Sequence, residues 1–133
     1  MASVWTELVI DCEDPHRLAD FWRAVLGYAH IEEDKDGDVL ISDVDRTPEA
    51  RSSGAFPPAL LFQRVPDGPK KSKNRLHIDL SPIDRARDAE VERVLALGAT
   101  RVDIGQGEEI VGWTVLADPE GNEFCVLRGY VGA

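Results

Sequence analysis

The sequence contains one short pattern twice. Residues 8–11 read Leu-Val-Ile-Asp, and residues 76–79 read Leu-His-Ile-Asp. Each pattern is followed by a stretch with helical spacing that ends in Leu-Gly, at residues 26–27 and 97–98. A supersecondary unit that occurs twice in one chain buries apolar surface against its copy. The two halves are therefore expected to form related modules around a shared cavity.

The first half predicts a strand, a helix and three further strands. Residues 5–12 fit a strand, with Leu8, Ile10 and Cys12 on one face and Glu7, Val9 and Asp11 on the other. The following Asp14 and Pro15 suit the start of a helix, because Asp caps free backbone N–H groups and Pro fits the first turn. Gly27 suits its end. The remaining strands are expected near residues 29–33, 39–43 and 60–65.

The second half predicts the same order of elements. Residues 76–80 form the expected first strand, and Asp84 is expected to open a helix that Gly98 ends. Strands should follow near residues 100–103, 113–117 and 123–127. Both modules are thus βαβββ units, and the chain is predicted to be a single α+β domain over residues 1–133. Its parts are a first module at about 4–66, a linker at 67–74 and a second module at about 75–130.

The composition excludes several classes of protein. A net charge of −10 argues against nucleic acid or an anionic membrane as a partner, because both would repel the chain. No apolar run approaches the roughly twenty residues that span a bilayer. The first residues lack the pattern of a secretion signal, and the two cysteines, Cys12 and Cys125, suit a reducing compartment. We expect a cytoplasmic protein.

Two segments between the expected elements allow more than one interpretation. The run at residues 43–58 contains no strand pattern and would be either a lid or a mobile loop. The linker brings together Lys70, Lys71 and Lys73, with Arg75 next to them. These cations either face solvent or clamp an anionic group of a substrate.

Because each helix can cover one face of its sheet, the opposite face stays free to carry chemistry. Strand alternation places seven residues on this free face: Glu7, Asp11, Leu61, Gln63, His77, Asp79 and Cys125. Such residues are often merely solvated. If they converge, however, their carboxylates require a divalent metal, a cationic ligand or protonation.

The chain resembles the vicinal oxygen chelate superfamily, and its glyoxalase-like branch in particular. The resemblance rests on the doubled βαβββ layout, on His77, and on the turn at residues 118–122, which reads Asp-Pro-Glu-Gly-Asn. It implies curved mixed sheets around a cavity between the modules, and often a homodimer. Relatives of this kind include glyoxalase I, extradiol dioxygenases and proteins that sequester bleomycin without chemistry.

The resemblance also implies a metal site, from which this sequence departs. The superfamily usually places a ligand seven residues before the helix-capping Asp, which gives Glu7 and His77 here. The third ligand is usually a Glu shortly after the Gly-Asn turn, and Cys125 occupies that place. A thiolate beside a carboxylate would favour zinc over magnesium or manganese. Alternatively, Cys125 is an inert core residue.

Two functions from different classes follow. In the first, the chain is an enzyme in which a divalent ion (Zn, Mn, Fe or Ni) polarises two neighbouring oxygens of a small substrate and Asp11 or Asp79 moves a proton. Its reaction would be an isomerase, lyase or dioxygenase-like step. In the second, the chain is a metal-free binding protein of the bleomycin-resistance type. In either case Gln63, Trp113 and Arg75 are the expected substrate-binding residues.

Overall fold

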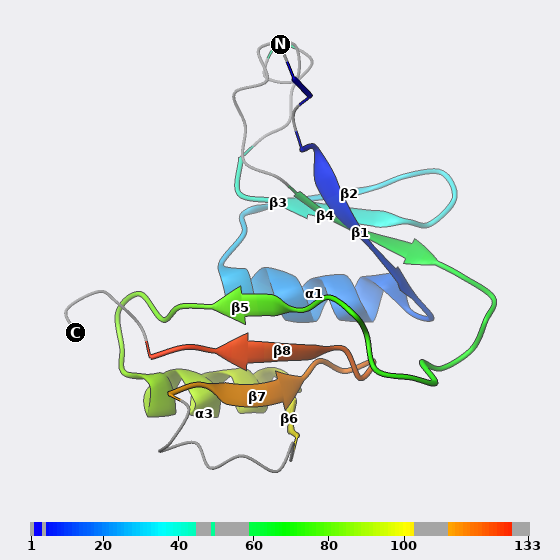
Figure 1. Cartoon of the computed structure of the whole chain (residues 1–133). Coiled ribbons are helices and arrows are strands. Elements are labelled where there is room, and N and C mark those ends of the chain that lie inside the picture. Colours follow the sequence, from blue (N-terminus) through cyan, green and yellow to red (C-terminus); the bar gives the residue numbers. More distant parts are fainter. Residues whose placement is uncertain (1, 4, 45–48, 50–58, 103–111, 129–133) are drawn as a thin grey trace. The chain divides into compact units, whose positions relative to one another are not determined.

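The computed structural model describes the chain except for residues 1, 4, 45–48, 50–58, 103–111 and 129–133. The chain divides into two compact units, Met1–Pro69 and Lys70–Ala133. The division falls inside the predicted linker at residues 67–74. Within the described residues, each unit has a strand, a helix and three further strands, in that order (Figure 1).

The first unit is a four-stranded mixed sheet with one described helix. Its elements are β1 (Glu7–Cys12), α1 (Pro15–Leu26), β2 (His30–Glu33), β3 (Val39–Ser42) and β4 (Ala59–Arg64). The strand order is β1-β4-β3-β2, with β1 parallel to β4 and the other neighbours antiparallel. Helix α1 contacts β3 and β4, and Leu18, Trp22, Val39, Ile41 and Phe62 are buried in this core.

Local signals set both ends of α1, as the sequence predicts. The Asp14 side chain accepts a hydrogen bond from the Arg17 backbone N–H at 3.2 Å, and Pro15 begins the helix. Gly27 ends it in the left-handed conformation with φ of 69°, which glycine adopts without strain. Between these ends, the apolar side chains form one stripe that packs on the sheet.

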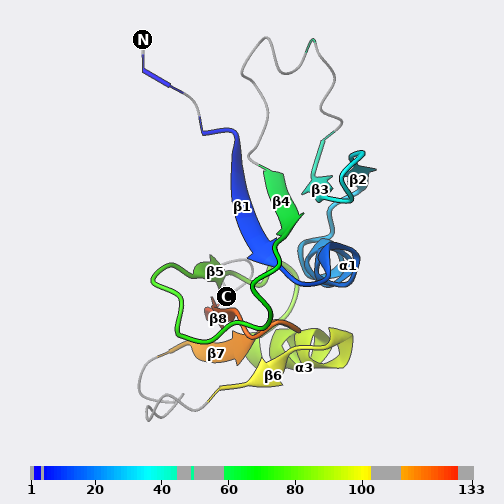
Figure 2. The ribbon, with the colours of Figure 1, turned by 90° about the vertical axis from the view of Figure 1, so that its right-hand side faces the viewer.

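The second unit repeats this architecture. Its elements are β5 (Ile78–Leu80), α3 (Arg87–Leu97), β6 (Thr100–Arg101), β7 (Thr114–Ala117) and β8 (Glu123–Val126). The order is β5-β8-β7-β6, with β5 parallel to β8. Figure 2 shows α3 on one side of these strands, and it contacts β8. The predicted α+β class with two βαβββ modules is therefore confirmed.

The predicted start of the second helix is wrong. The helix begins at Arg87, and its N-cap is Ala86, which makes no side-chain capping bond. Asp84 instead accepts a hydrogen bond from the Arg85 guanidinium at 3.0 Å, which lowers the pKa of the Asp84 carboxyl. The side chain that would have capped the helix is thus engaged by its neighbour.

Several strands are shorter than expected. In the first strand of each module, β1 starts at Glu7 and β5 at Ile78, so that Leu76 and His77 lie just before β5. Most of the segment 43–58 lies outside the described residues. Among the described residues, none of the helices has the length and apolar character needed to cross a membrane.

Candidate metal centre

The free face of the second sheet gathers three of the residues that the sequence singles out. Asp79 on β5 lies opposite Cys125 on β8, and Val115 on β7 lies on the other side of Cys125. The neighbours of Cys125 along its strand, Phe124 and Val126, are buried in the core. Strand alternation therefore points Cys125 away from the core, on the same face as Asp79.

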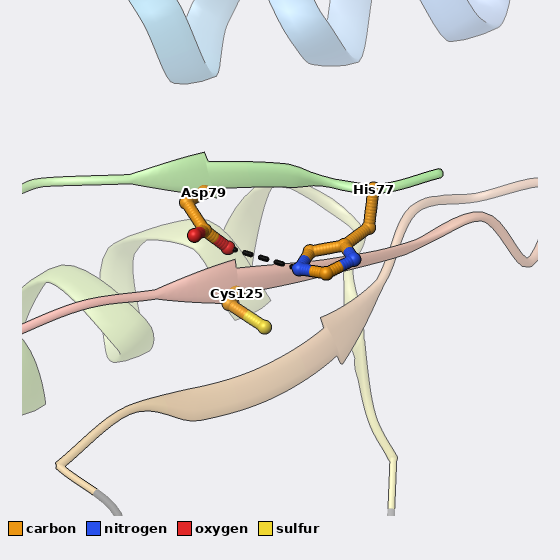
Figure 3. A group of neighbouring side chains, drawn as sticks. All are labelled: His77, Asp79 and Cys125. Carbon is orange, nitrogen blue, oxygen red and sulfur yellow. Dashed lines mark ion pairs between the residues drawn. The ribbon is translucent and has the colours of Figure 1, made fainter. Parts of the chain in front are cut away.

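His77, Asp79 and Cys125 form a compact group of potential metal ligands (Figure 3). One donor atom from each residue lies within 4.8 Å of the other two. The Nε2 atom of His77 is 3.2 Å from Oδ1 of Asp79. The side chains of His77 and Asp79 are 55% and 51% exposed, whereas Cys125 is 9% exposed. The group thus has a buried sulfur on one side and an open side accessible to ligands.

The environment of the Cys125 thiol favours its protonated form. Burial raises the pKa of this thiol, and the Asp79 carboxylate raises it further through its charge and as a hydrogen-bond acceptor. Glu123 acts in the same direction, while Lys73 opposes it. A nucleophilic cysteine requires a lowered pKa. The structure therefore argues against Cys125 as an activated nucleophile when no cation is bound.

A pocket of about 310 Å³ lies against the cluster. Apolar and aromatic side chains form part of its lining, and polar side chains form the rest. The lining residues are Lys73, Asn74, Leu76, His77, Asp79, Trp113, Val115, Glu123, Phe124, Cys125 and Leu127. Pockets for small molecules have this mixed character and a volume in this range.

Polar bonds join the segment before β5 to the β7–β8 hairpin. Lys73 Nζ is 2.9 Å from Glu123 Oε1, and Asn74 Nδ2 donates to Asn122 Oδ1 at 2.8 Å. The sequence left Lys73 either facing solvent or clamping an anionic group, and it suggested no site role for Asn74. Alternation puts Glu123 on the strand face of Cys125, but no sequence pattern reports such long-range polar pairs.

Of the other predicted site residues, Trp113 lines this pocket, and four do not belong to its lining. Glu7, Asp11 and Gln63 belong to the first unit, where Glu7 begins β1 and Asp11 pairs with Gln63 in register. Gln63 lines an open depression of about 790 Å³ in that unit. Arg75 is exposed and does not line the pocket beside His77. A shared site for Glu7, Asp11 and His77 stays a prediction.

The chemistry of the cluster suits a divalent cation. Its donors are an imidazole nitrogen, a carboxylate oxygen and a cysteine sulfur. These are the ligand types that zinc takes in proteins, and three of them leave a coordination position for water or substrate. The residues present therefore fit a catalytic metal.

Comparison with known proteins agrees with the architecture. Two βαβββ modules with four-stranded mixed sheets define the vicinal oxygen chelate class of fold. The model of the family described as the glyoxalase-like domain matches residues 7–127, so the chain belongs to this family within that superfamily. No match was found among curated proteins.

Solved structures with the same fold include proteins linked to fosfomycin resistance. A variant of the fosfomycin resistance protein FosX from Listeria monocytogenes, complexed with Mn(II) and 1S,2S-dihydroxypropylphosphonic acid, is 14% identical, with a TM-score of 0.66 over 98% of this chain and 93% of that chain. FosX from Mesorhizobium loti is also 14% identical, with a TM-score of 0.60 over 98% and 94%. A glyoxalase/bleomycin resistance protein/dioxygenase family enzyme from Burkholderia phytofirmans is 16% identical, with a TM-score of 0.63 over 93% and 97%.

Proposed function

We propose that this protein is a metal-assisted enzyme acting on a small molecule, with its active site in the pocket beside His77. One observation carries the proposal: three potential metal ligands meet at the wall of a pocket of about 310 Å³. Pockets with apolar walls and a few convergent polar groups are where small molecules usually bind.

Each part of the pocket has a role in this proposal. A divalent cation beside His77 would supply a Lewis acid for two neighbouring oxygens of the substrate. Trp113, Val115 and Leu127 provide apolar surface that excludes water and packs against the substrate's carbon skeleton. Glu123, held by Lys73 at 2.9 Å, and Asp79 are the pocket carboxylates that can accept a proton from the substrate.

This arrangement suits reactions that begin with proton removal next to a carbonyl. Isomerisations, epimerisations and some lyase steps share this beginning. The Mn(II) and the phosphonic acid in the FosX complex show that one protein of this fold holds a metal and a small polar molecule. That example supports the proposal of a metal and a small polar ligand at this site. A homodimer and a cytoplasmic location remain predictions from the sequence.

The alternative is a binding protein without chemistry. It is favoured by the apolar side chains around the pocket and by the thiol environment, which disfavours a thiolate in the metal-free protein. A protein of this kind would hold an aromatic or cationic molecule against Trp113 and the pocket carboxylates.

Proton exchange in D₂O distinguishes the two functions even while the substrate is unidentified. A panel of small hydroxyketones and 2-hydroxy acids would be incubated with protein supplied in turn with zinc, manganese, iron and nickel, and NMR would follow deuterium uptake at the carbon next to the carbonyl. We expect deuterium uptake for at least one compound. In His77→Ala the rate of uptake should fall by roughly 100-fold or more, in line with the rate enhancement that acid–base groups and metal ions usually contribute.

The matched control is His16→Ala. His16 pairs with Glu33 at 3.0 Å and is 56% exposed, so it reproduces the His77–Asp79 pair without a cysteine. This variant should retain wild-type exchange. If the panel raises the melting temperature of the protein but no compound exchanges or reacts with any of the metals, the binding function is correct and the enzyme proposal fails.

A further inference from the structure

We infer that the cation is zinc and that His77, Asp79 and Cys125 hold it, so that the second module supplies the protein ligands by itself. In this arrangement Asp79 takes the ligand role that the count from the helix cap assigns to Glu7, and Glu123 is the pocket carboxylate left to accept a proton from the substrate. The inference rests on the proposed function, because it specifies the metal of that site.

The backbone holds the three donors in a fixed relation. Asp79 and Cys125 are direct neighbours in the β5–β8 ladder, and His77 lies two residues before Asp79 on the same face. Their donor atoms already lie within 4.8 Å of one another. Small side-chain rotations would bring them to the distances of about 2.0–2.3 Å from a shared zinc ion that nitrogen, oxygen and sulfur ligands adopt.

The first module does not repeat this set of donors. In the repeat, Val9 takes the place of His77, and Asp11 takes the place of Asp79. The register partner of Asp11 is Gln63, whereas that of Asp79 is Cys125. The first module thus has a carboxylate at these positions without the imidazole and the thiol that accompany it in the second module.

The donor set selects among metals. A thiolate prefers zinc and other soft or borderline cations, whereas magnesium and manganese prefer oxygen ligands. Zinc with three protein ligands keeps its fourth position open, as catalytic zinc sites do. The half-exposed side chains of His77 and Asp79 leave that position facing the pocket.

Charge balance points in the same direction. Lys73 pairs with Glu123 at 2.9 Å, so these two charges offset each other. The Asp79 carboxylate and a Cys125 thiolate would then present two negative charges, and metal binding removes the thiol proton as it forms the bond to sulfur. A divalent cation neutralises the pair without help from a further carboxylate.

Cobalt(II) and zinc titrations of the full-length protein test the inference. Cobalt bound to a thiolate gives a charge-transfer absorption in the near ultraviolet, and calorimetry gives the zinc affinity. We expect stoichiometric zinc, the charge-transfer band, and tighter binding of zinc than of manganese. Cys125→Ser should abolish the band, and Asp79→Asn and His77→Ala should each weaken zinc binding by roughly 100-fold or more, beyond the 10–100-fold typical of outer-shell partners.

Two further variants make the result specific. The variant His16→Ala removes the histidine of the exposed His16–Glu33 pair in the first module, and it should bind zinc as the wild type does. Glu7→Gln should also leave the zinc affinity within about threefold, a difference of roughly 0.7 kcal/mol. Circular dichroism would establish that each variant is folded.

The outcomes separate this inference from the enzyme proposal. If Glu7→Gln weakens binding strongly while Asp79→Asn does not, or if manganese binds more tightly than zinc, the assigned ligand set is wrong, but a metal enzyme remains. If the folded wild type binds none of the metals offered, the inference and the metal-assisted function fail together.

Discussion

Trp22→Ala is expected to destabilise the first module by about 3–5 kcal/mol, the range for removing a large aromatic side chain from a core. Trp22 is 2% exposed on the buried face of α1. Its ring meets Phe21 edge-to-face at a centroid distance of 5.3 Å. The substitution therefore removes apolar contacts, leaves a cavity and ends an aromatic interaction. Urea denaturation followed by circular dichroism would measure the loss.

Trp5→Ala is the matched control for this prediction. Trp5 is 65% exposed, and its indole N–H donates to the Glu7 carbonyl at 3.2 Å on the surface. Its removal should change the free energy of unfolding by about 0.5 kcal/mol or less, as is usual for surface positions. Equal losses in the two variants would show that α1 does not pack on its sheet as described.

Asp118→Ala is expected to lower the free energy of unfolding by about 3 kcal/mol and to disturb the pocket. Asp118 is 3% exposed at the turn between β7 and β8. Its carboxylate accepts hydrogen bonds from the backbone N–H groups of Glu120 and Asn122 and from the Asn122 side chain, at 2.9–3.1 Å. Hydrogen bonds to a charged group contribute about 1.5–3 kcal/mol, and unsatisfied donors add a penalty.

The loss should extend to the site, because Asn122 also accepts a hydrogen bond from Asn74, three residues before His77. We therefore expect weaker zinc binding in Asp118→Ala as well as a lower urea midpoint. The control is Asp34→Ala: Asp34 accepts from the backbone N–H groups of Asp36 and Asp38 in an exposed turn. Because water can replace its carboxylate as the hydrogen-bond acceptor, the free energy of unfolding should fall by about 1 kcal/mol or less. A larger loss at Asp34 than at Asp118 would contradict the role given to the buried turn.

Local chemistry made much of the fold predictable. Asp14, Pro15 and Gly27 act within one or two residues of the helix ends that they set, so a single sequence reveals them. The alternation along β1 and β8 is equally local. Because both modules use the same order of elements, the internal repeat predicted the architecture of the second from the first.

The sequence was less informative about side chains whose role depends on which of several partners they bind. Asp84 has the side chain of a good N-cap, but Arg85 binds its carboxylate and the helix starts at Arg87. Similarly, Lys73 resembles a solvated connector residue, and its ion pair with Glu123 spans fifty residues. No local pattern specifies such pairs, because they form after the hairpin and the preceding segment have come together.

The candidate site was predictable in part. Alternation placed His77 and Asp79 on one face and singled out Cys125. The register that sets Asp79 opposite Cys125 is a tertiary property of the β5–β8 pair, and it makes the proton-transfer candidate Asp79 a candidate metal ligand. The family resemblance pointed instead to Glu7 as a metal ligand, because a resemblance assigns roles by position in the sequence and does not report which side chains meet.

Anomalous diffraction at the zinc absorption edge, from crystals of the wild-type protein grown with zinc, tests the central claim most directly. We expect a single strong peak at about 2.0–2.3 Å from His77, from Asp79 and from the sulfur of Cys125. A zinc peak bound by other side chains, with these three left free, would contradict it.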